Sequence, residues 1–394
     1  MVNNRHHVRL GLEKLLEGGS DSLRGARVGL VCNQASVDHR LHHAADLLHE
    51  HPDIRLTALF GPQHGIRGDV QDNMIETAHG TDRQTGLPVH SLYSETREPT
   101  EAMLRDVDVL LIDMQDVGCR IYTFAYTMAN CMRAARRFGK KVVVCDRPNP
   151  INGIGVNGNV LEARQASFVG QFAMPTRHGM TIGELAQLFN RHFDLGSDLE
   201  VVPMEGWSRE YWHDETDARW VLPSPNMPTL DSATVFPGAV HFEGTQMSEG
   251  RGTTRPFELI GAPYVVPEHY AAELNALNLS GVFFRSCVFQ PTFQKHGGVA
   301  CGGVQIHVTE RDTFEPVITG VGMVKTAHDM YPEDFRWKEP PYEYVFDRNP
   351  FDVISGTTKT REAIERGSSL DSISEGWQHD LKLFKAVREQ YLLY

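Results

Sequence analysis

Four short and nearly continuous apolar runs, separated by helix-like sequence, constrain the fold of this chain more than any other feature. The runs are "ARVGLVC" (26–32), "IRLTALF" (54–60), "VDVLLID" (107–113) and "KKVVVCD" (140–146). Runs rich in Val, Leu and Ile without polar alternation are typical of strands buried on both faces, as in parallel sheets. The sequences at 40–51 and 122–139 show helical spacing of apolar residues. Strand, helix and strand in repetition predict a doubly wound, mostly parallel α/β sheet.

The chain has 394 residues, which is long for a single hydrophobic core, so we expect two domains. Three prolines in "LPSPNMPT" (222–229) resist both helix and central strand and indicate a boundary there. The predicted domains are therefore 1–228 and a smaller α/β domain, 229–394. Further elements expected from the pattern are a helix at 181–193, a strand at 199–204, ordered loops over 235–264, a strand at 302–308, and helices near 313–330, 358–366 and 374–391.

Charge and composition exclude several classes of protein. A formal net charge of −13 disfavours binding to nucleic acid or to an anionic membrane, because both require a basic surface. No apolar run approaches the ~20 residues of a membrane span, and the N-terminal sequence lacks the core of a signal peptide, so we expect a cytoplasmic protein. The six cysteines form no CxxC pair, and the histidines lack metal-ligand spacing. The sequence predicts reduced thiols and no metal or organic cofactor.

Polar segments follow each predicted strand. They are "NQAS" (33–36), "GPQHGIRG" (61–68), "MQDVGCRIYT" (114–123) and "RPNP" (147–150). In doubly wound sheets, ligands bind beyond the carboxyl ends of the strands. The sequence therefore predicts a site there, with His64 facing the cleft.

Three other segments contain groups that can transfer protons or bind anions. "EGTQMSEGRGTT" (243–254) combines Glu243, Glu249 and Arg251 in a glycine-rich loop, and the alternative interpretation is a loop held by internal ion pairs. "DMQDVGCRIYTF" (113–124) holds Asp116 and Arg120, which could instead form an ion pair with each other.

In "RHGMTIGELA" (177–186), Thr181 and Glu184 have the spacing of a capping box at the start of a helix. That structural role is the alternative to catalysis for Glu184. His178 lies just before the cap, where the backbone N–H groups of the helix also point.

Taken in order, these blocks resemble the exo-β-N-acetylmuramidase family of glycoside hydrolases. The resemblance also includes "TGLPVHSLY" (85–93), "DRPNPINGIGVNG" (146–158), "PSPNMPT" (223–229) and "FQPTFQKHGG" (289–298), and it extends from residue 27 to the C-terminus. It implies a Rossmann-like N-terminal domain, a smaller C-terminal domain and an active cleft between them. It also implies release of N-acetylmuramic acid from the non-reducing end of peptidoglycan fragments during cell-wall recycling. The lactyl carboxylate of that sugar could be held by Arg251, Arg67 or Arg147.

Gln63 departs from the family pattern, which often has glutamate before the histidine. An amide cannot act as a general acid, so another carboxyl group takes that role or the activity is altered. Because a 2-acetamido sugar can supply its own nucleophile, one acid and one polarising group can suffice. The alternatives to a muramidase are a catalytically silent amino-sugar-binding protein and a hydrolase of a different glycoside on the same fold.

We therefore predict two sets of site residues. The acid candidates, in order, are Glu243, Glu249, Asp116 and Glu184, with His64 or His178 in proton transfer and Gln63 holding the acetamido group or water. The predicted substrate-binding residues are Gln63, Arg67, Arg120, Tyr122, Arg147, Asn149, His178, Asn226 and Arg251.

Overall fold

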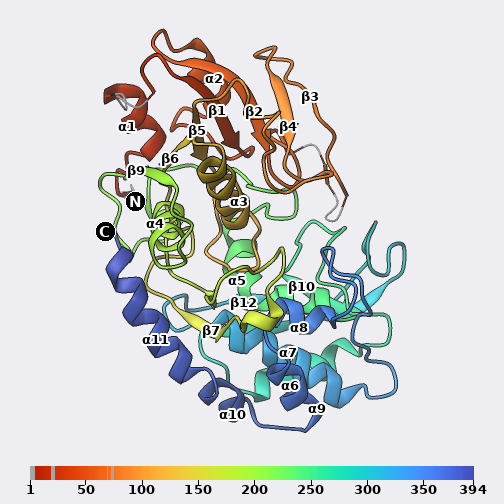
Figure 1. Ribbon diagram of the computed structural model, residues 1–394. Coiled ribbons are helices and arrows are strands. Elements are labelled where there is room, and N and C mark those ends of the chain that lie inside the picture. The colour runs from red at the N-terminus through yellow and green to blue at the C-terminus, as the bar shows by residue number, and fades with distance from the viewer. Residues whose placement is uncertain (1–4, 19–22, 69, 72–74) are drawn as a thin grey trace.

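The main sheet contains seven strands and is parallel except at one edge. The protein is described by a computed structural model that covers residues 5–18, 23–68, 70–71 and 75–394. The strand order is β3-β4-β2-β1-β5-β6-β9, and only the pairing of β3 with β4 is antiparallel (Figure 1). The strands are β1 (Arg27–Cys32), β2 (Arg55–Gly61), β3 (Gly80–Thr81), β4 (Pro88–Ser91), β5 (Val109–Asp113), β6 (Lys141–Cys145) and β9 (Asp198–Val202). The predicted mostly parallel α/β sheet is confirmed.

Helices cover both faces of this sheet. The α-helices of the described residues are α1 (Gly11–Gly18), α2 (Ala44–Glu50), α3 (Phe124–Arg137), α4 (Ile182–Arg191), α5 (Leu230–Ala239), α6 (Pro267–Ala276), α7 (Pro316–Met330), α8 (Pro350–Ser355), α9 (Lys359–Glu365), α10 (Leu370–Glu375) and α11 (Gln378–Arg388). Leu30 and Leu111 belong to the core beneath α1 and α2, whereas Leu110 and Ile112 belong to the core beneath α3 and α4. Successive side chains of a strand point to opposite faces, so a sheet covered on both faces needs continuous apolar runs.

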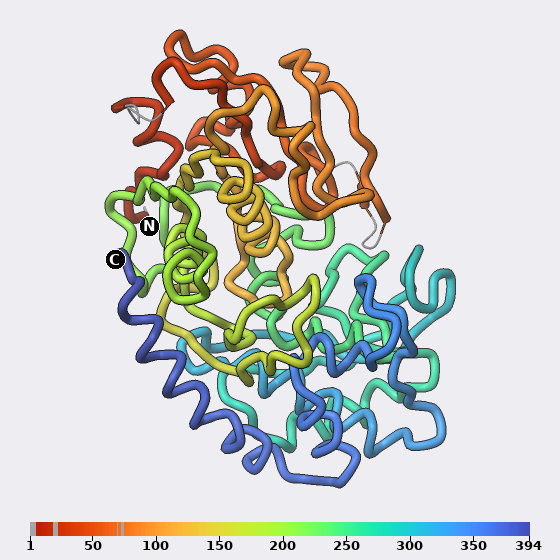
Figure 2. Tube along the Cα trace, viewed as in Figure 1, coloured from red at the N-terminus to blue at the C-terminus, as the bar shows by residue number. Residues whose placement is uncertain are grey.

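The C-terminal part of the chain contains a smaller antiparallel sheet. Its order is β10 (Leu259–Ala262), β12 (Cys301–Val308) and β11 (Val282–Phe289), while β7 (Asn157–Val160) and β8 (Pro175–Arg177) form a separate pair. The chain then returns along the side of the molecule through α11, which contacts β7 (Figure 2). The hydroxyl of Tyr394 donates a hydrogen bond to Asp146 (2.8 Å) at the end of β6. The predicted division into domains at residue 229 stays a prediction.

The segment 235–264 was expected to form loops, and this prediction is wrong in part. It contains the second half of α5, a 3₁₀ helix η3 (Val240–Gly244) and strand β10. The hydroxyl of Thr229 caps α5 by accepting from the backbone N–H of Ser232 (3.1 Å). A Cβ atom on Gly238 of α5 would collide with the backbone of α7, and one on Gly320 of α7 would collide with Gly238. These glycines permit close packing of two helices, although glycine in sequence suggests a loop.

Candidate active site

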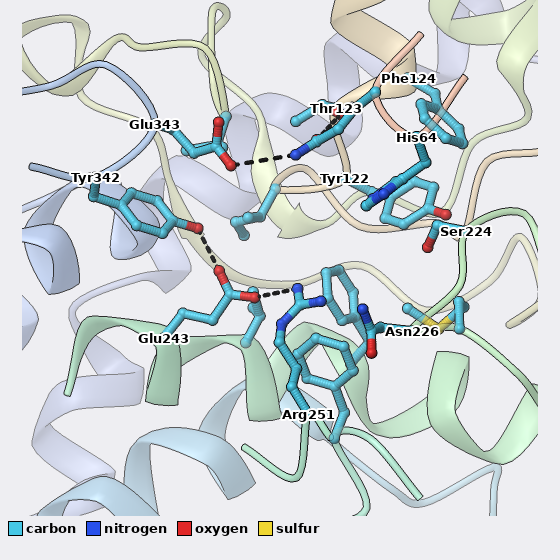
Figure 3. A pocket seen from close by; sticks show the side chains of 17 residues that line it. His64, Tyr122, Thr123, Phe124, Ser224, Asn226, Glu243, Arg251, Tyr342 and Glu343 are labelled. Carbon is cyan, nitrogen blue, oxygen red and sulfur yellow. Dashed lines mark hydrogen bonds and ion pairs between the residues drawn. The ribbon is translucent and has the colours of Figure 1, made fainter. Parts of the chain in front are cut away.

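A pocket lies where loops after β2 and β5 meet segments from the C-terminal part of the chain (Figure 3). Its polar lining consists of Gln63, His64, Tyr122, Thr123, Ser224, Asn226, Glu243, Arg251, Tyr342 and Glu343. Its apolar lining consists of Ile121, Phe124, Val169, Met227, Phe236, Val240 and Phe257. An apolar pocket with a few convergent polar groups is typical of a small-molecule site.

A tight turn at 62–65 directs Gln63 into this pocket. The N–H of Gly65 donates to the carbonyl of Pro62 (3.0 Å), and His64 has a φ of 73°, in the left-handed region. The amide oxygen of Gln63 accepts from the hydroxyl of Thr123 (3.1 Å), and its Nε2 donates to Oε1 of Glu343 (3.5 Å). Both ends of the amide are therefore held, one by the N-cap residue of α3 and the other by a carboxyl group.

His64 follows Gln63 and also lines the pocket. Its Nδ1 lies 2.7 Å from the carbonyl oxygen of Val70, which can only accept a hydrogen bond. The neutral ring therefore carries its proton on Nδ1.

Glu243 lies in η3 and is ionised by its surroundings. Its Oε1 accepts from Nη2 of Arg251 (2.6 Å), and its Oε2 accepts from the hydroxyl of Tyr342 (2.7 Å). Burial alone raises the pKa of Glu243, but the charge and hydrogen bond of Arg251 and the hydrogen bond from Tyr342 outweigh it and lower this pKa below its ordinary value. An ionised carboxylate cannot donate a proton, so this group is suited to stabilising positive charge or to acting as a nucleophile or base.

Glu249 lies behind Arg251 and outside the pocket lining. Its carboxylate lies 2.9 Å from Nζ of Lys295 and 3.4 Å from Nε of Arg251. The alternative interpretation of this loop, that internal ion pairs hold it together, therefore describes Glu249. Its position does not support the predicted role as a catalytic acid.

Glu343 was not among the predicted residues, although its carboxyl group lines the pocket. It lies at the tip of a two-residue hairpin turn, closed by reciprocal backbone hydrogen bonds of 2.9 Å between Tyr342 and Val345. Glu343 and Tyr344 have φ values of 42° and 66°. Two consecutive left-handed residues define a type I′ turn, which usually contains Asn and Gly. The sequence "YEYV" carries none of the usual signals for such a turn.

The surroundings of Glu343 shift its pKa in the direction opposite to that of Glu243. The hydroxyl of Tyr93 donates to its Oε2 (2.8 Å), and the residue is only 4% exposed. Burial is the largest influence and raises the pKa of Glu343, and the charge of Glu243 raises it further. Hydrogen bonds from Tyr93 and Gln63 and the charge of Arg251 oppose this rise without cancelling it. Two carboxyl groups with pKa values displaced in opposite directions are typical of an acid and its partner.

Three of the predicted binding residues are engaged in structural contacts outside the pocket lining. Arg67 pairs with Asp46 (3.0 Å) and Asp82 (3.2 Å). Arg147 forms a buried, bidentate ion pair with Asp113 (2.6 and 2.7 Å). Asn149 fixes a turn by donating to the carbonyl of Met180 (3.0 Å) and accepting from the N–H of Ile151 (3.2 Å). Their positions do not support the predicted contacts with substrate.

Asp116, Arg120 and His178 also lie outside the lining. Nη2 of Arg120 donates to the carbonyls of Ile354 and Ser355 (both 2.9 Å), so the expected alternative, an Asp116–Arg120 ion pair, does not describe this arginine. Asp116 instead accepts from the N–H of Gly118 (2.7 Å) and lies 3.6 Å from Nε2 of His178. These three side chains support the loops behind the pocket.

Glu184 is a structural residue of α4. It completes the capping box with Thr181, forms an ion pair with Arg209 and accepts from the N–H of Leu393 (2.8 Å). Its side chain is fully buried, and its contacts lie away from the pocket. The alternative interpretation of the "TIGE" sequence, a capping box, therefore describes Glu184, and its position does not support the predicted role as a catalytic acid.

Within the described residues, no group of three His, Cys, Asp or Glu side chains is placed to hold a metal ion. The same part of the chain contains no helix both long and apolar enough to cross a membrane. All six cysteines are free thiols.

Comparisons with known proteins match the whole architecture. Family models described as the N-terminal and C-terminal parts of exo-β-N-acetylmuramidase NamZ match residues 28–231 and 234–394. A peptidoglycan β-N-acetylmuramidase NamZ from Bacillus subtilis (strain 168) is 48% identical, over 98% of this chain and 91% of that protein. Two crystal structures of DUF1343 family proteins from Bacteroides fragilis NCTC 9343 are also similar. One has a TM-score of 0.89 at 36% identity, covering 99% of this chain and all of that one. The other has a TM-score of 0.76 at 29% identity, covering 98% and 99%.

Proposed function

Because this chain belongs to the exo-β-N-acetylmuramidase family of glycoside hydrolases, we propose that it releases N-acetylmuramic acid from the non-reducing end of peptidoglycan fragments. The observation that carries this proposal is the pocket between the two family-matched segments, which contains both Glu243 and Glu343. Glycoside hydrolysis commonly uses two carboxyl groups on either side of the bond that breaks.

Glu243 suits the role of the ionised partner in this reaction. Its carboxylate is fixed by Arg251 and Tyr342 and faces the pocket. Positive charge develops at the anomeric carbon as a glycosidic bond breaks, and a fixed carboxylate stabilises that charge. The carbonyl oxygen of the substrate's acetamido group attacks the same carbon, as the substrate-assisted route allows.

Arg251 is our candidate for the group that binds the lactyl carboxylate. Of the three arginines predicted for this role, it alone lines the pocket, whereas Arg67 and Arg147 are held by aspartates elsewhere. Gln63, His64, Tyr122 and Asn226 line the same pocket and complete the proposed binding surface.

The first test compares hydrolysis of a 4-nitrophenyl β-N-acetylmuramide with that of the corresponding N-acetylglucosaminide. We expect release of nitrophenol from the muramide, with the higher kcat/KM. Binding of the muramide without any turnover would contradict the proposal and support the alternative of a silent sugar-binding protein, which the presence of Gln63 favours.

Replacing Arg251 with alanine should reduce the preference for the muramide. A hydrogen bond to a charged group contributes about 1.5–3 kcal/mol, so the ratio of the two kcat/KM values should fall by about 10- to 100-fold. The ratio isolates lactyl binding, because any damage to Glu243 affects both substrates alike. Arg67→Ala is the matched control and should leave the ratio unchanged. A preserved ratio in Arg251→Ala would remove this arginine from lactyl recognition.

A further inference from the structure

We propose that Glu343 is the general acid of this enzyme, a role that the amide of Gln63 cannot fill. This inference rests on the proposed hydrolysis. Three features of the structure support it: the position of the carboxyl group, the surroundings that keep it protonated, and the backbone conformation that holds it.

The carboxyl group of Glu343 lies in the pocket beside the side chain of Gln63. Its Oε1 lies 3.5 Å from Nε2 of Gln63, and both residues line the pocket. Figure 3 shows the carboxyl group of Glu343 above that of Glu243, with the hydroxyl of Tyr342 at a height between them. A bond placed between these two groups meets a proton donor on one side and a carboxylate on the other, as glycoside hydrolysis requires.

The surroundings of Glu343 favour its neutral, proton-bearing form. Burial is the main cause of its raised pKa, and the negative charge of Glu243 adds to it. The charge of Arg251 opposes this rise, but Arg251 is already paired with Glu243 (2.6 Å). A carboxyl group that stays protonated at higher pH than usual is suited to donate a proton near neutrality.

The turn holds this carboxyl group in a conformation that non-glycine residues rarely adopt. Glu343 and Tyr344 are both left-handed, and a guanidinium, that of Arg97, stacks 3.7 Å above the ring of Tyr344. The hydroxyl of Tyr344 also hydrogen-bonds to Glu76 (3.3 Å). Backbone strain of this kind persists only where the surrounding structure fixes it. These contacts fix the turn, and with it the direction of the Glu343 side chain.

The reaction balances with these groups alone. Glu343 transfers its proton to the glycosidic oxygen as the bond from that oxygen to the anomeric carbon breaks, and the aglycone leaves as an alcohol. The acetamido oxygen bonds to the anomeric carbon and forms a cyclic oxazolinium ion. Glu343, now ionised, removes a proton from water as the water oxygen attacks the anomeric carbon. The oxazolinium ring opens to restore the acetamido group, N-acetylmuramic acid is released, and Glu343 is protonated again. Hydrogen bonds from Tyr93 and Gln63 stabilise its carboxylate between the two steps.

The test is the variant Glu343→Gln, which keeps the size and polarity of the side chain but cannot donate a proton. Loss of a general acid lowers turnover by about 100- to 10,000-fold. We expect that loss with a muramyl disaccharide, whose leaving oxygen needs a proton. We expect a much smaller loss of kcat/KM with a 2,4-dinitrophenyl muramide, because this constant reports the first step and the leaving group departs as an anion. Glu339→Gln, an exposed position four residues earlier, is the control and should leave both rates unchanged. Equal losses on the two substrates, or none, would overturn the assignment.

A second variant tests the same proposal with the carboxyl group left in place. Tyr93→Phe removes a hydrogen bond that lowers the pKa of Glu343, so this pKa should rise. Activity needs the protonated acid and is lost as pH rises through its pKa, so the basic limb of the kcat profile should move to higher pH. An unmoved basic limb would count against Glu343. Failure of the wild-type protein to hydrolyse any muramide would instead contradict the proposed function, so the two proposals fail separately.

Discussion

Exchanging the acid and the amide, in the double variant Gln63→Glu/Glu343→Gln, should restore much of the turnover that Glu343→Gln alone removes. The two side chains are 3.5 Å apart at their closest polar atoms, so the exchange keeps their atoms, their net charge and their shared hydrogen bond. It also places glutamate where the family often has it. General acid catalysis contributes about 100- to 10,000-fold, so recovery of at least 10-fold over the single variant is expected with the muramyl disaccharide. A double variant no more active than Glu343→Gln would show that an acid at position 63 cannot reach the glycosidic oxygen.

The single variant Gln63→Glu provides the control for this exchange. It places two carboxyl groups side by side in a buried pocket, where they cannot both ionise readily. The pair should titrate in two well-separated steps, and the second apparent pKa should lie above that of Glu343 in the wild-type protein. The basic limb of kcat should therefore move to higher pH, which a profile of kcat against pH with the nitrophenyl muramide measures. A basic limb at the wild-type position would contradict contact between the two groups.

The variant Asp113→Asn should destabilise the fold strongly and leave Arg147 without a counter-ion. Asp113 ends β5, and its side chain is completely buried against Arg147, which is 4% exposed. Removing one partner of a buried ion pair costs about 3–5 kcal/mol, because the remaining charge stays buried and unpaired. The free energy of unfolding, measured with urea at pH 7, should fall by that amount. Asp106→Asn, which removes an exposed partner of Arg27, is the control and should change it by less than about 1 kcal/mol.

The double variant Asp113→Leu/Arg147→Met separates the loss of a partner from the loss of the pair. Replacing both members of a buried ion pair by apolar side chains is often neutral or stabilising. Most of the stability lost in Asp113→Asn should therefore return. Loss of muramide binding in a stable double variant would instead support the predicted role of Arg147 in binding substrate.

The central sheet could be predicted from sequence because strands buried on both faces have a recognisable local pattern, a continuous run of apolar residues. Strands β1, β2, β5 and β6 are each a nearly continuous apolar run, so each can be identified from its own local sequence. Short strands such as β3, which has two residues, are too short to show such a pattern. The second half of α5 was predicted as loop because the segment from residue 235 is rich in Gly, Thr and Pro. Gly238 in fact permits close contact with α7, and that partner lies far away in sequence.

The site could be predicted only where its residues follow strands or gather in one loop. Gln63 and His64 follow β2, and Glu243 and Arg251 share one polar segment, so local sequence indicated all four. Arg67 and Arg147 have the same local appearance, but aspartates from other segments hold them. Glu343 is separated from Gln63 by 280 residues, and its turn has none of the usual turn residues. Its role depends on burial and on neighbours that the fold alone brings together.

The contact between Gln63 and Glu343 joins a segment that is synthesised early to one that is synthesised late. Translation proceeds from the N-terminus, and N-terminal elements generally fold first. Strand β2, which precedes Gln63, and helix α3, which follows Thr123, are synthesised long before the turn at 342–345 leaves the ribosome. A nascent chain that has already formed the parallel sheet therefore contains Gln63 and Thr123 but lacks Glu343, the proposed proton donor. On this proposal, hydrolysis requires the turn at 342–345 to be in place, so activity arises only after that later segment has been synthesised.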